Sequence, residues 1–307
     1  MKPIRGMFLP LPTVFKHDGS PDEAVMRDMV NHYVDAGVDA LFVTGSFGQG
    51  PAMNADERRR VAEVVLEENR HRVPAIVHIG TADPYSTIEL GRHALEHGAE
   101  GVGIVGPYYY SDHSQAEIKD YFRLIGRELT CPILVYNNAG YSGYPIGPEL
   151  MKQLVADSPQ IFGSKVADSN LDAALQYHYL LGPEFGLYIG ASTLVPGVLA
   201  GLSGTISPPL SLCPKLGVET VKAAEQGNLD RALRLQLEVV EFHARITGFW
   251  RRFGYGLFSA ALREVGFAVQ KYPRWPTPEV DEQSIELLRA CLRRAQQALS
   301  TGEPQLV

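Results

Sequence analysis

The sequence predicts an α/β fold in which eight parallel strands close into a (β/α)8 barrel, or TIM barrel, followed by a C-terminal α-helical extension. Two observations support this prediction. Short apolar runs alternate with amphipathic stretches eight times before residue 207. After that residue, amphipathic stretches follow one another with no apolar run between them. We therefore divide the chain into a barrel of residues 1–222 and an extension of residues 223–307 that packs on the barrel.

The eight apolar runs are typical of buried parallel strands, because they are apolar on both faces rather than alternating. They span residues 6–11, 40–44, 75–79, 101–105, 133–136, 161–166, 186–189 and 204–206. The main alternative is a doubly wound open sheet, which usually has fewer strands and carries a glycine-rich phosphate-binding turn after its first strand. No such turn follows the first run, so the closed barrel is favoured.

Helix starts and ends lie between these runs. Ser20, Asn54 and Asp83 are each placed to cap the N-terminus of a helix. Gly37 and Gly98 each follow a helical stretch, where a left-handed residue ends a helix well. In the extension, four amphipathic stretches span residues 216–226, 229–246, 253–265 and 281–299, and three prolines separate the last two.

The composition indicates a cytoplasmic protein that binds neither nucleic acid nor a membrane. The net charge is −7, with acids and bases mixed along the chain and no basic run. No stretch approaches about 18 consecutive apolar residues, and the N-terminus does not resemble a signal peptide. The three cysteines form no CxxC pair and predict no disulfide framework. No metal-ligand motif lies at the strand ends and no nucleotide motif occurs, so we expect neither a metal nor a cofactor.

Lys165 lies within the apolar run of residues 161–167. A lone lysine in a buried strand is costly to desolvate. Burial favours the neutral amine, which is a nucleophile that can form a Schiff base with a carbonyl substrate. The alternative is a lysine near a strand end that extends its amine to water.

The ends of the other strands supply further candidates, because active sites of such barrels form at the carboxyl ends of the strands. Tyr136 ends the strand beside that of Lys165, where its phenol could transfer protons or could simply pack. A glycine-rich turn at residues 45–50 could bind an anion through its N–H groups, or could use glycine for positive φ. Three consecutive tyrosines at residues 108–110 favour an interface.

Together these segments resemble the dihydrodipicolinate synthase / N-acetylneuraminate lyase family of class I aldolases. The resemblance runs from about Arg5 into the C-terminal helices. It rests on four motifs in the expected order, which are Gly45-Ser46-Phe47-Gly48-Gln49, Pro107-Tyr108-Tyr109, Tyr136-Asn137 and Gly163-Ser164-Lys165. It implies a homotetramer built as a dimer of tight dimers.

The resemblance also implies catalytic roles. Lys165 would condense with the keto group of pyruvate or a pyruvate-derived acid. Tyr136 would carry protons to and from the intermediates. Ser46 would relay protons between Tyr136 and Tyr109, the latter reaching in from a neighbouring subunit. A protonated imine accepts electrons and thereby stabilises the carbanion left when a carbon–carbon bond breaks.

Substrate-binding roles follow from the same resemblance. The N–H groups of Ser46 and Phe47 would hold the substrate carboxylate, and the carbonyl of Ile206 would line the keto-acid pocket. Gly190 and Ser192, at the end of the seventh strand, complete the set together with Tyr141.

The chain departs from the family pattern at positions that select the second substrate. Phe47 replaces a hydroxyl residue, and Gln49 replaces a glutamate. Tyr141 falls where dihydrodipicolinate synthases carry an arginine, and Ser192 and Thr193 fall where sialic-acid lyases place acidic residues. The generic activity therefore carries over, while neither named activity does.

The sequence thus predicts a Schiff-base-forming lyase that cleaves or condenses a pyruvate-derived 2-keto acid with an aldehyde. One alternative is a dehydratase of a 2-keto-3-deoxy sugar acid that uses the same imine. An alternative of another class is a catalytically inactive barrel that binds a keto acid, since fold alone does not establish function.

Overall fold

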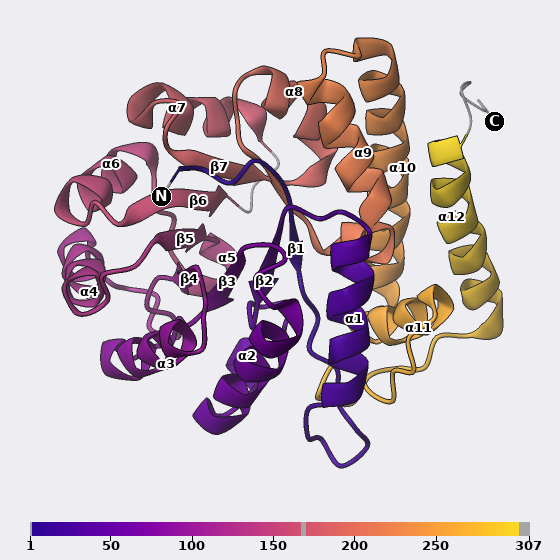
Figure 1. The fold of residues 1–307 in the computed structure, drawn as a ribbon, viewed down its shortest axis with the longest axis horizontal. Helices are drawn as coiled ribbons and strands as arrows, with labels where there is room; N and C mark the ends of the chain where they lie inside the picture. The colour runs from indigo at the N-terminus through magenta and orange to yellow at the C-terminus, as the bar shows by residue number, and fades with distance from the viewer. Residues whose placement is uncertain (1, 167–169, 301–307) are drawn as a thin grey trace.

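The computed structural model describes residues 2–166 and 170–300, where eight parallel strands close into a barrel in sequence order. The strands are β1 Gly6–Pro10, β2 Ala40–Val43, β3 Ala75–His78, β4 Gly101–Val105, β5 Ile133–Asn137, β6 Ile161–Val166, β7 Gly186–Ile189 and β8 Gly204–Ile206. Pairing of β1 with β8 completes the closure. Figure 1 shows the strands at the centre with helices around them. The predicted (β/α)8 barrel is confirmed, and the ends of the strands differ from prediction by one residue at most.

Twelve α-helices accompany the strands in the described ranges. Those of the barrel are α1 Glu23–Asp35, α2 Ala55–Asn69, α3 Pro84–Glu96, α4 Gln115–Glu128, α5 Ala139–Ser142, α6 Pro148–Asp157, α7 Leu171–Leu181 and α8 Leu194–Leu199. Those that follow are α9 Pro214–Glu225, α10 Leu229–Phe253, α11 Gly256–Val265 and α12 Glu282–Ser300. Short 3₁₀ turns are η1 Gly50–Ala52, η2 Ala191–Thr193 and η3 Pro208–Leu212.

Most of the predicted helix boundaries are formed as expected. The side chain of Asn54 accepts a hydrogen bond from the Glu57 N–H, and the Glu57 carboxylate accepts one from the Asn54 N–H, each at 2.9 Å. This reciprocal pair is a capping box. Asp83 caps α3, and Gly37 and Gly98 have positive φ values of 84° and 92°.

The predicted cap at Ser20 is wrong. Helix α1 begins at Glu23, and the side chain of Asp22 accepts from the N–H of Val25. Ser20 is occupied elsewhere, because its hydroxyl donates to Asp18 at 2.7 Å in the preceding turn. An aspartate two residues downstream of a serine competes for the same capping position, since both residue types cap well.

The C-terminal helices pack on one side of the barrel, as Figure 1 shows for α9, α10 and α12. Helix α10 packs against both α9 and α12. It continues to Phe253, beyond the predicted end at residue 246, and passes through Gly248 without a break. Residue 222, the expected boundary of the barrel, lies within α9, and residues 301–307 of the expected extension lie outside the described ranges.

The segment after α11 returns to the carboxyl ends of the strands and is fixed there. The backbones of Phe15 and Lys271 exchange hydrogen bonds of 3.0 Å. The Tyr272 hydroxyl donates to the Phe47 carbonyl at 2.8 Å. Arg274 forms an ion pair with Glu57, the residue of the capping box that opens α2. These contacts hold the extension against the turn that follows β2.

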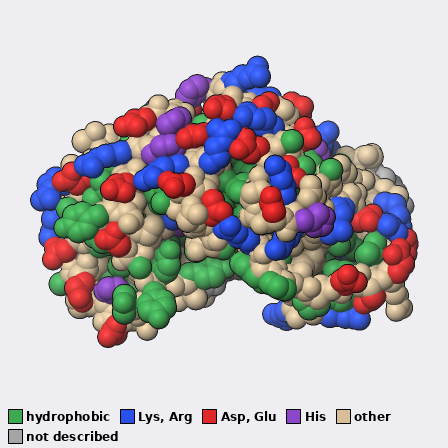
Figure 2. All heavy atoms as spheres, turned by 90° about the horizontal axis from the view of Figure 1, so that it is seen from below, with side chains coloured by type: hydrophobic (Ala, Val, Ile, Leu, Met, Phe, Trp, Pro, Cys, Tyr) green, Lys and Arg blue, Asp and Glu red, His purple; other side chains and the backbone are tan. Residues whose placement is uncertain are grey.

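Two properties of the surface bear on partners. Acidic and basic side chains are mixed over the face shown in Figure 2, in keeping with the mixed charge of the sequence. Among the helices in the described part of the chain, none combines the length and apolar character needed to cross a membrane.

Candidate active site

Lys165 and Tyr136 face each other at the centre of the site. They lie on the neighbouring strands β6 and β5, and the register pairs them directly. The Lys165 Nζ lies 4.2 Å from the centre of the Tyr136 ring, and the lysine is only 8% exposed. The predicted burial of this lysine is confirmed, although Ala167, at the end of the predicted apolar run, lies outside the described residues.

The surroundings of Tyr136 determine the charge of its phenol. Burial by itself would raise its pKa, but the positive charge of Lys165 and hydrogen bonds from Asn138, Ser46 and Lys165 outweigh burial. The net effect is a pKa below the usual value of 10. The Asn138 amide donates to the phenol oxygen at 3.1 Å. Because hydrogen bonds to the charged form favour it, this phenol gives up its proton more readily than a free one.

Ser46 reaches this pair from the turn after β2, where close packing of the backbone requires glycine. A Cβ on Gly50 would lie 1.9 Å from the Thr44 carbonyl oxygen, and one on Gly45 would lie 2.6 Å from the Phe42 ring. The positive φ values of this turn belong instead to Thr44 (54°) and Gln49 (57°). The glycines are therefore needed for close approach rather than for positive φ. The resulting bend brings Ser46 within hydrogen-bonding reach of Tyr136.

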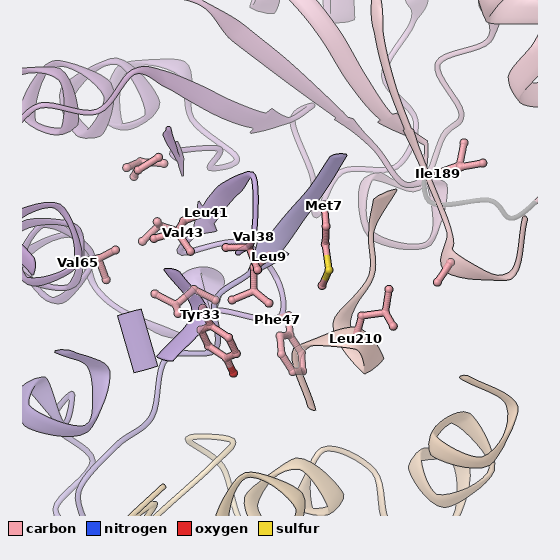
Figure 3. Close-up of a cluster of buried hydrophobic side chains, with 14 of the residues drawn as sticks. Met7, Leu9, Tyr33, Val38, Leu41, Val43, Phe47, Val65, Ile189 and Leu210 are labelled. Carbon is pink, nitrogen blue, oxygen red and sulfur yellow. The ribbon is translucent and has the colours of Figure 1, made fainter. Parts of the chain in front are cut away.

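The Phe47 side chain is buried and anchors the turn to the helical extension. Its ring lies 4.7 Å from that of Phe258 and 5.6 Å from that of Tyr272, both edge to face. Figure 3 shows Phe47 pointing from the barrel towards the tan helices of the extension. Phe47 also contributes to the wall of the lysine cavity. Its bulk thus serves packing as well as the site.

A small cavity surrounds the lysine, and aromatic side chains close it. Its volume is about 30 Å³, enough for a water-sized group. Tyr141 and Tyr255 lie at its edge, and their hydroxyl oxygens are 3.3 Å apart. Burial is the main cause that raises the pKa values of both tyrosines, so both are neutral donors and acceptors near neutral pH.

The remaining predicted site residues lie at the strand ends but not all in this cavity. Ile206 is buried in the same apolar cluster as Tyr136. Gly190 precedes η2 and Ser192 lies within it, where the Ser192 carbonyl accepts from Gln236 at 3.2 Å. Neither lines the lysine cavity in the described part of the chain. Tyr109 is 84% exposed and has a φ of 80°, which is rare for a residue other than glycine.

Other side chains of the site were not predicted from the sequence. His78 is buried at the end of β3, with its ring 6.1 Å from that of Tyr136. Its Nε2 accepts from the Val105 N–H at 3.2 Å. Burial, followed by the charges of Arg58 and Lys165, lowers its pKa well below the usual value, so the ring is neutral. Its position at a strand end is a signal that the sequence does contain.

A separate group of possible metal ligands lies on the outer helices. Within the described ranges, Glu63, His93 and His97 are the three side chains of this kind that lie close enough to share an ion. Glu63 is already paired with Arg60 at 2.9 Å and with His93 at 3.0 Å. These residues lie on α2 and at the end of α3, and none of them lines the lysine cavity.

The fold and site together define a class of (β/α)8-barrel enzyme with a buried lysine beside a tyrosine at the carboxyl ends of its strands. The chain matches the Dihydrodipicolinate synthetase family over residues 3–295, and it belongs to that family. It is 32% identical to 4-hydroxy-tetrahydrodipicolinate synthase of Brucella abortus over 241 residues, which cover 78% of this chain and 82% of that one. It is 27% identical to the probable 2-dehydro-3-deoxy-D-pentonate aldolase YjhH of Escherichia coli over 299 residues, which cover 95% and 97%.

A solved structure shows the same architecture. That of YagE, a prophage protein of the dihydrodipicolinic acid synthase family from Escherichia coli in complex with pyruvate, matches with a TM-score of 0.87 at 26% identity. The match covers 95% of this chain and 98% of that one. Since the relatives are named as a synthase and aldolases, this chain is an enzyme of the lyase class.

Proposed function

We propose that this enzyme cleaves or condenses a pyruvate-derived 2-keto acid with an aldehyde through a Schiff base on Lys165. The observation that carries the proposal is the buried Lys165 amine 4.2 Å from the centre of the Tyr136 ring. The pyruvate in the YagE structure supports a keto acid as the first substrate.

The proposed reaction uses the groups around Lys165 in order. The Lys165 amine attacks the keto carbon, and the resulting carbinolamine loses water to give a protonated imine. In cleavage, the electron pair of the breaking carbon–carbon bond moves into the imine, which leaves an enamine and releases the aldehyde. Tyr136 accepts the proton of the substrate hydroxyl and passes it on through Ser46. Protonation and hydrolysis of the enamine then release pyruvate.

Reductive trapping tests the Schiff base directly. Pyruvate with sodium borohydride should inactivate the enzyme and add the mass of reduced pyruvate to the peptide that contains Lys165. Lys152, which is on the outer helix α6, serves as the internal control. A label on another lysine, or no label from any keto acid, would contradict the proposal. Absence of label together with tight pyruvate binding would instead indicate an inactive keto-acid-binding barrel.

We also propose that the enzyme is a homotetramer, a dimer of tight dimers in which Tyr109 completes a neighbour's site. Tyr109 and Tyr110 are both exposed, and their rings meet edge to face at 5.1 Å. The Tyr109 backbone has a strained φ of 80°, and its side chain is 84% exposed. Large amphipathic rings are favoured at interfaces. Sedimentation at equilibrium should give four chains per particle.

A further inference from the structure

A second cavity continues from the lysine cavity and has room for a larger group. It is a groove of about 310 Å³. Ser46, Tyr141 and Tyr255 line both the groove and the lysine cavity. Because the two cavities share these three residues, the part of a substrate that extends beyond the lysine cavity would lie in this groove. A cavity of about 150 Å³ suffices for benzene, so a single aromatic ring with substituents fits here.

The walls of this groove are mainly aromatic and aliphatic. Apart from the three shared residues and Gln49, it is lined by Pro51, Ala52, Val105, Tyr108 and Trp275. The rings of Tyr255 and Trp275 meet edge to face at 5.4 Å. Trp275 is 43% exposed and Tyr141 46% exposed, so both rings have surface that a ligand can cover. Among the described residues that line the groove, none carries a charge.

These walls match one kind of aldehyde better than others. An aldehyde with a carboxylate would place its charge among aromatic rings with no arginine or lysine to pair it. One with several hydroxyl groups would compete for polar groups that already have partners, since the Tyr141 and Tyr255 hydroxyls are 3.3 Å apart and the Gln49 side-chain oxygen accepts from the Arg274 N–H. An aromatic ring would pack edge to face or offset against Tyr255 and Trp275.

We infer that the groove binds the aldehyde part of the substrate, and that this part is an uncharged aromatic group of about the size of benzaldehyde. This inference rests on the proposed Schiff base at Lys165, because that bond fixes where the second substrate lies. It differs from what the names of the relatives suggest, since those describe a synthase and a sugar-acid aldolase.

Competition between aldehydes tests the inference. The condensation of pyruvate with benzaldehyde is compared with that of pyruvate with D-glyceraldehyde and with aspartate semialdehyde, and kcat/KM is measured for each. We expect benzaldehyde to exceed both others by at least tenfold. Trp275→Ala should reduce this ratio at least tenfold by removing one wall. Tyr85→Ala is the matched control, because Tyr85 is an exposed ring on α3 that lines neither cavity, and it should leave the ratio unchanged.

Borohydride trapping separates the two proposals. Each variant is first shown to trap pyruvate, which establishes a folded site with a reactive lysine. If pyruvate is trapped but kcat/KM for glyceraldehyde or aspartate semialdehyde equals or exceeds that for benzaldehyde, the aromatic substrate is refuted while the Schiff base stands. A ratio unaffected by Trp275→Ala would overturn the role of the groove. Failure of the wild-type enzyme to trap any keto acid would overturn the proposed function itself, and the inference with it.

Discussion

Replacing Tyr136 by phenylalanine removes one oxygen atom from the centre of the site. That atom accepts a hydrogen bond from Asn138 at 3.1 Å, and Ser46 and Lys165 beside it help to lower the pKa of the phenol. Groups that act as general acid or base contribute about 100-fold to 10,000-fold to turnover. At about 1.36 kcal/mol for each factor of ten, this corresponds to about 2.7–5.4 kcal/mol of transition-state stabilisation. We expect Tyr136→Phe to lose activity within this range.

The fold of the same variant should persist. The lost oxygen leaves buried partners unsatisfied at a cost of about 1–3 kcal/mol. The free energy of unfolding of a typical domain is larger, at about 5–15 kcal/mol. Turnover is measured with pyruvate and benzaldehyde in steady state, and folding by circular dichroism and thermal unfolding. A folded variant that turns over at close to the wild-type rate would refute the reasoning, because Tyr136 would then only pack.

The pH dependence gives a second measurement on the same residue. Because the pKa of Tyr136 is lowered from 10, its phenolate becomes available at lower pH than that of a free tyrosine. The acidic limb of kcat/KM should report the ionisation of Tyr136. Asn138→Asp removes a donor to the phenol oxygen and adds a negative charge, so the limb should move to higher pH. The aspartate keeps an oxygen to cap Gly140, which limits structural effects. An unmoved limb would contradict this assignment.

Three further predictions concern assembly, stability and specificity. Tyr109→Ala should weaken both assembly and turnover. Mixing this variant with Lys165→Ala should restore part of the activity once subunit exchange is shown. No restoration after exchange would exclude a shared site. Phe47→Ala should reduce the free energy of unfolding, measured by urea titration, by about 3–5 kcal/mol, because it empties a buried position between the barrel and the extension. A loss below about 1 kcal/mol would contradict that packing role. In coupled assays, the enzyme should be weak both in condensing pyruvate with aspartate semialdehyde and in cleaving N-acetylneuraminate, because Tyr141 cannot bind a carboxylate through two N–H groups as arginine does. Rapid turnover of either substrate would show that another group binds that carboxylate.

The barrel could be predicted from the sequence because its strands are buried on both faces. Each is a short apolar run, and such a run differs clearly from the amphipathic helices on either side. Helix ends were harder to predict where neighbouring residues compete. Ser20 and Asp22 both cap well, and only the turn that engages the Ser20 hydroxyl decides between them.

The site also contains residues that could be predicted from the sequence and residues that could not. Lys165 and Tyr136 lie on predicted strands and Ser46 follows another, so the barrel geometry brings them together. The aromatic walls at Tyr255 and Trp275 come from the extension, far along the chain from those strands. Their position depends on how residues 271–274 fold back over the barrel, and no periodic pattern in the sequence indicates that path.

The return of the extension to the barrel mouth separates two tasks along the chain. The strands supply the groups for bond making and breaking, whereas Tyr255 and Trp275 supply two of the aromatic walls that would meet the second substrate. Changes in the later part of the gene can therefore alter which aldehyde is accepted while leaving the codons for the reacting groups untouched. A library randomised only between residues 250 and 280 would sample new substrates on a constant chemistry, and an ancestor could have diversified by the same route.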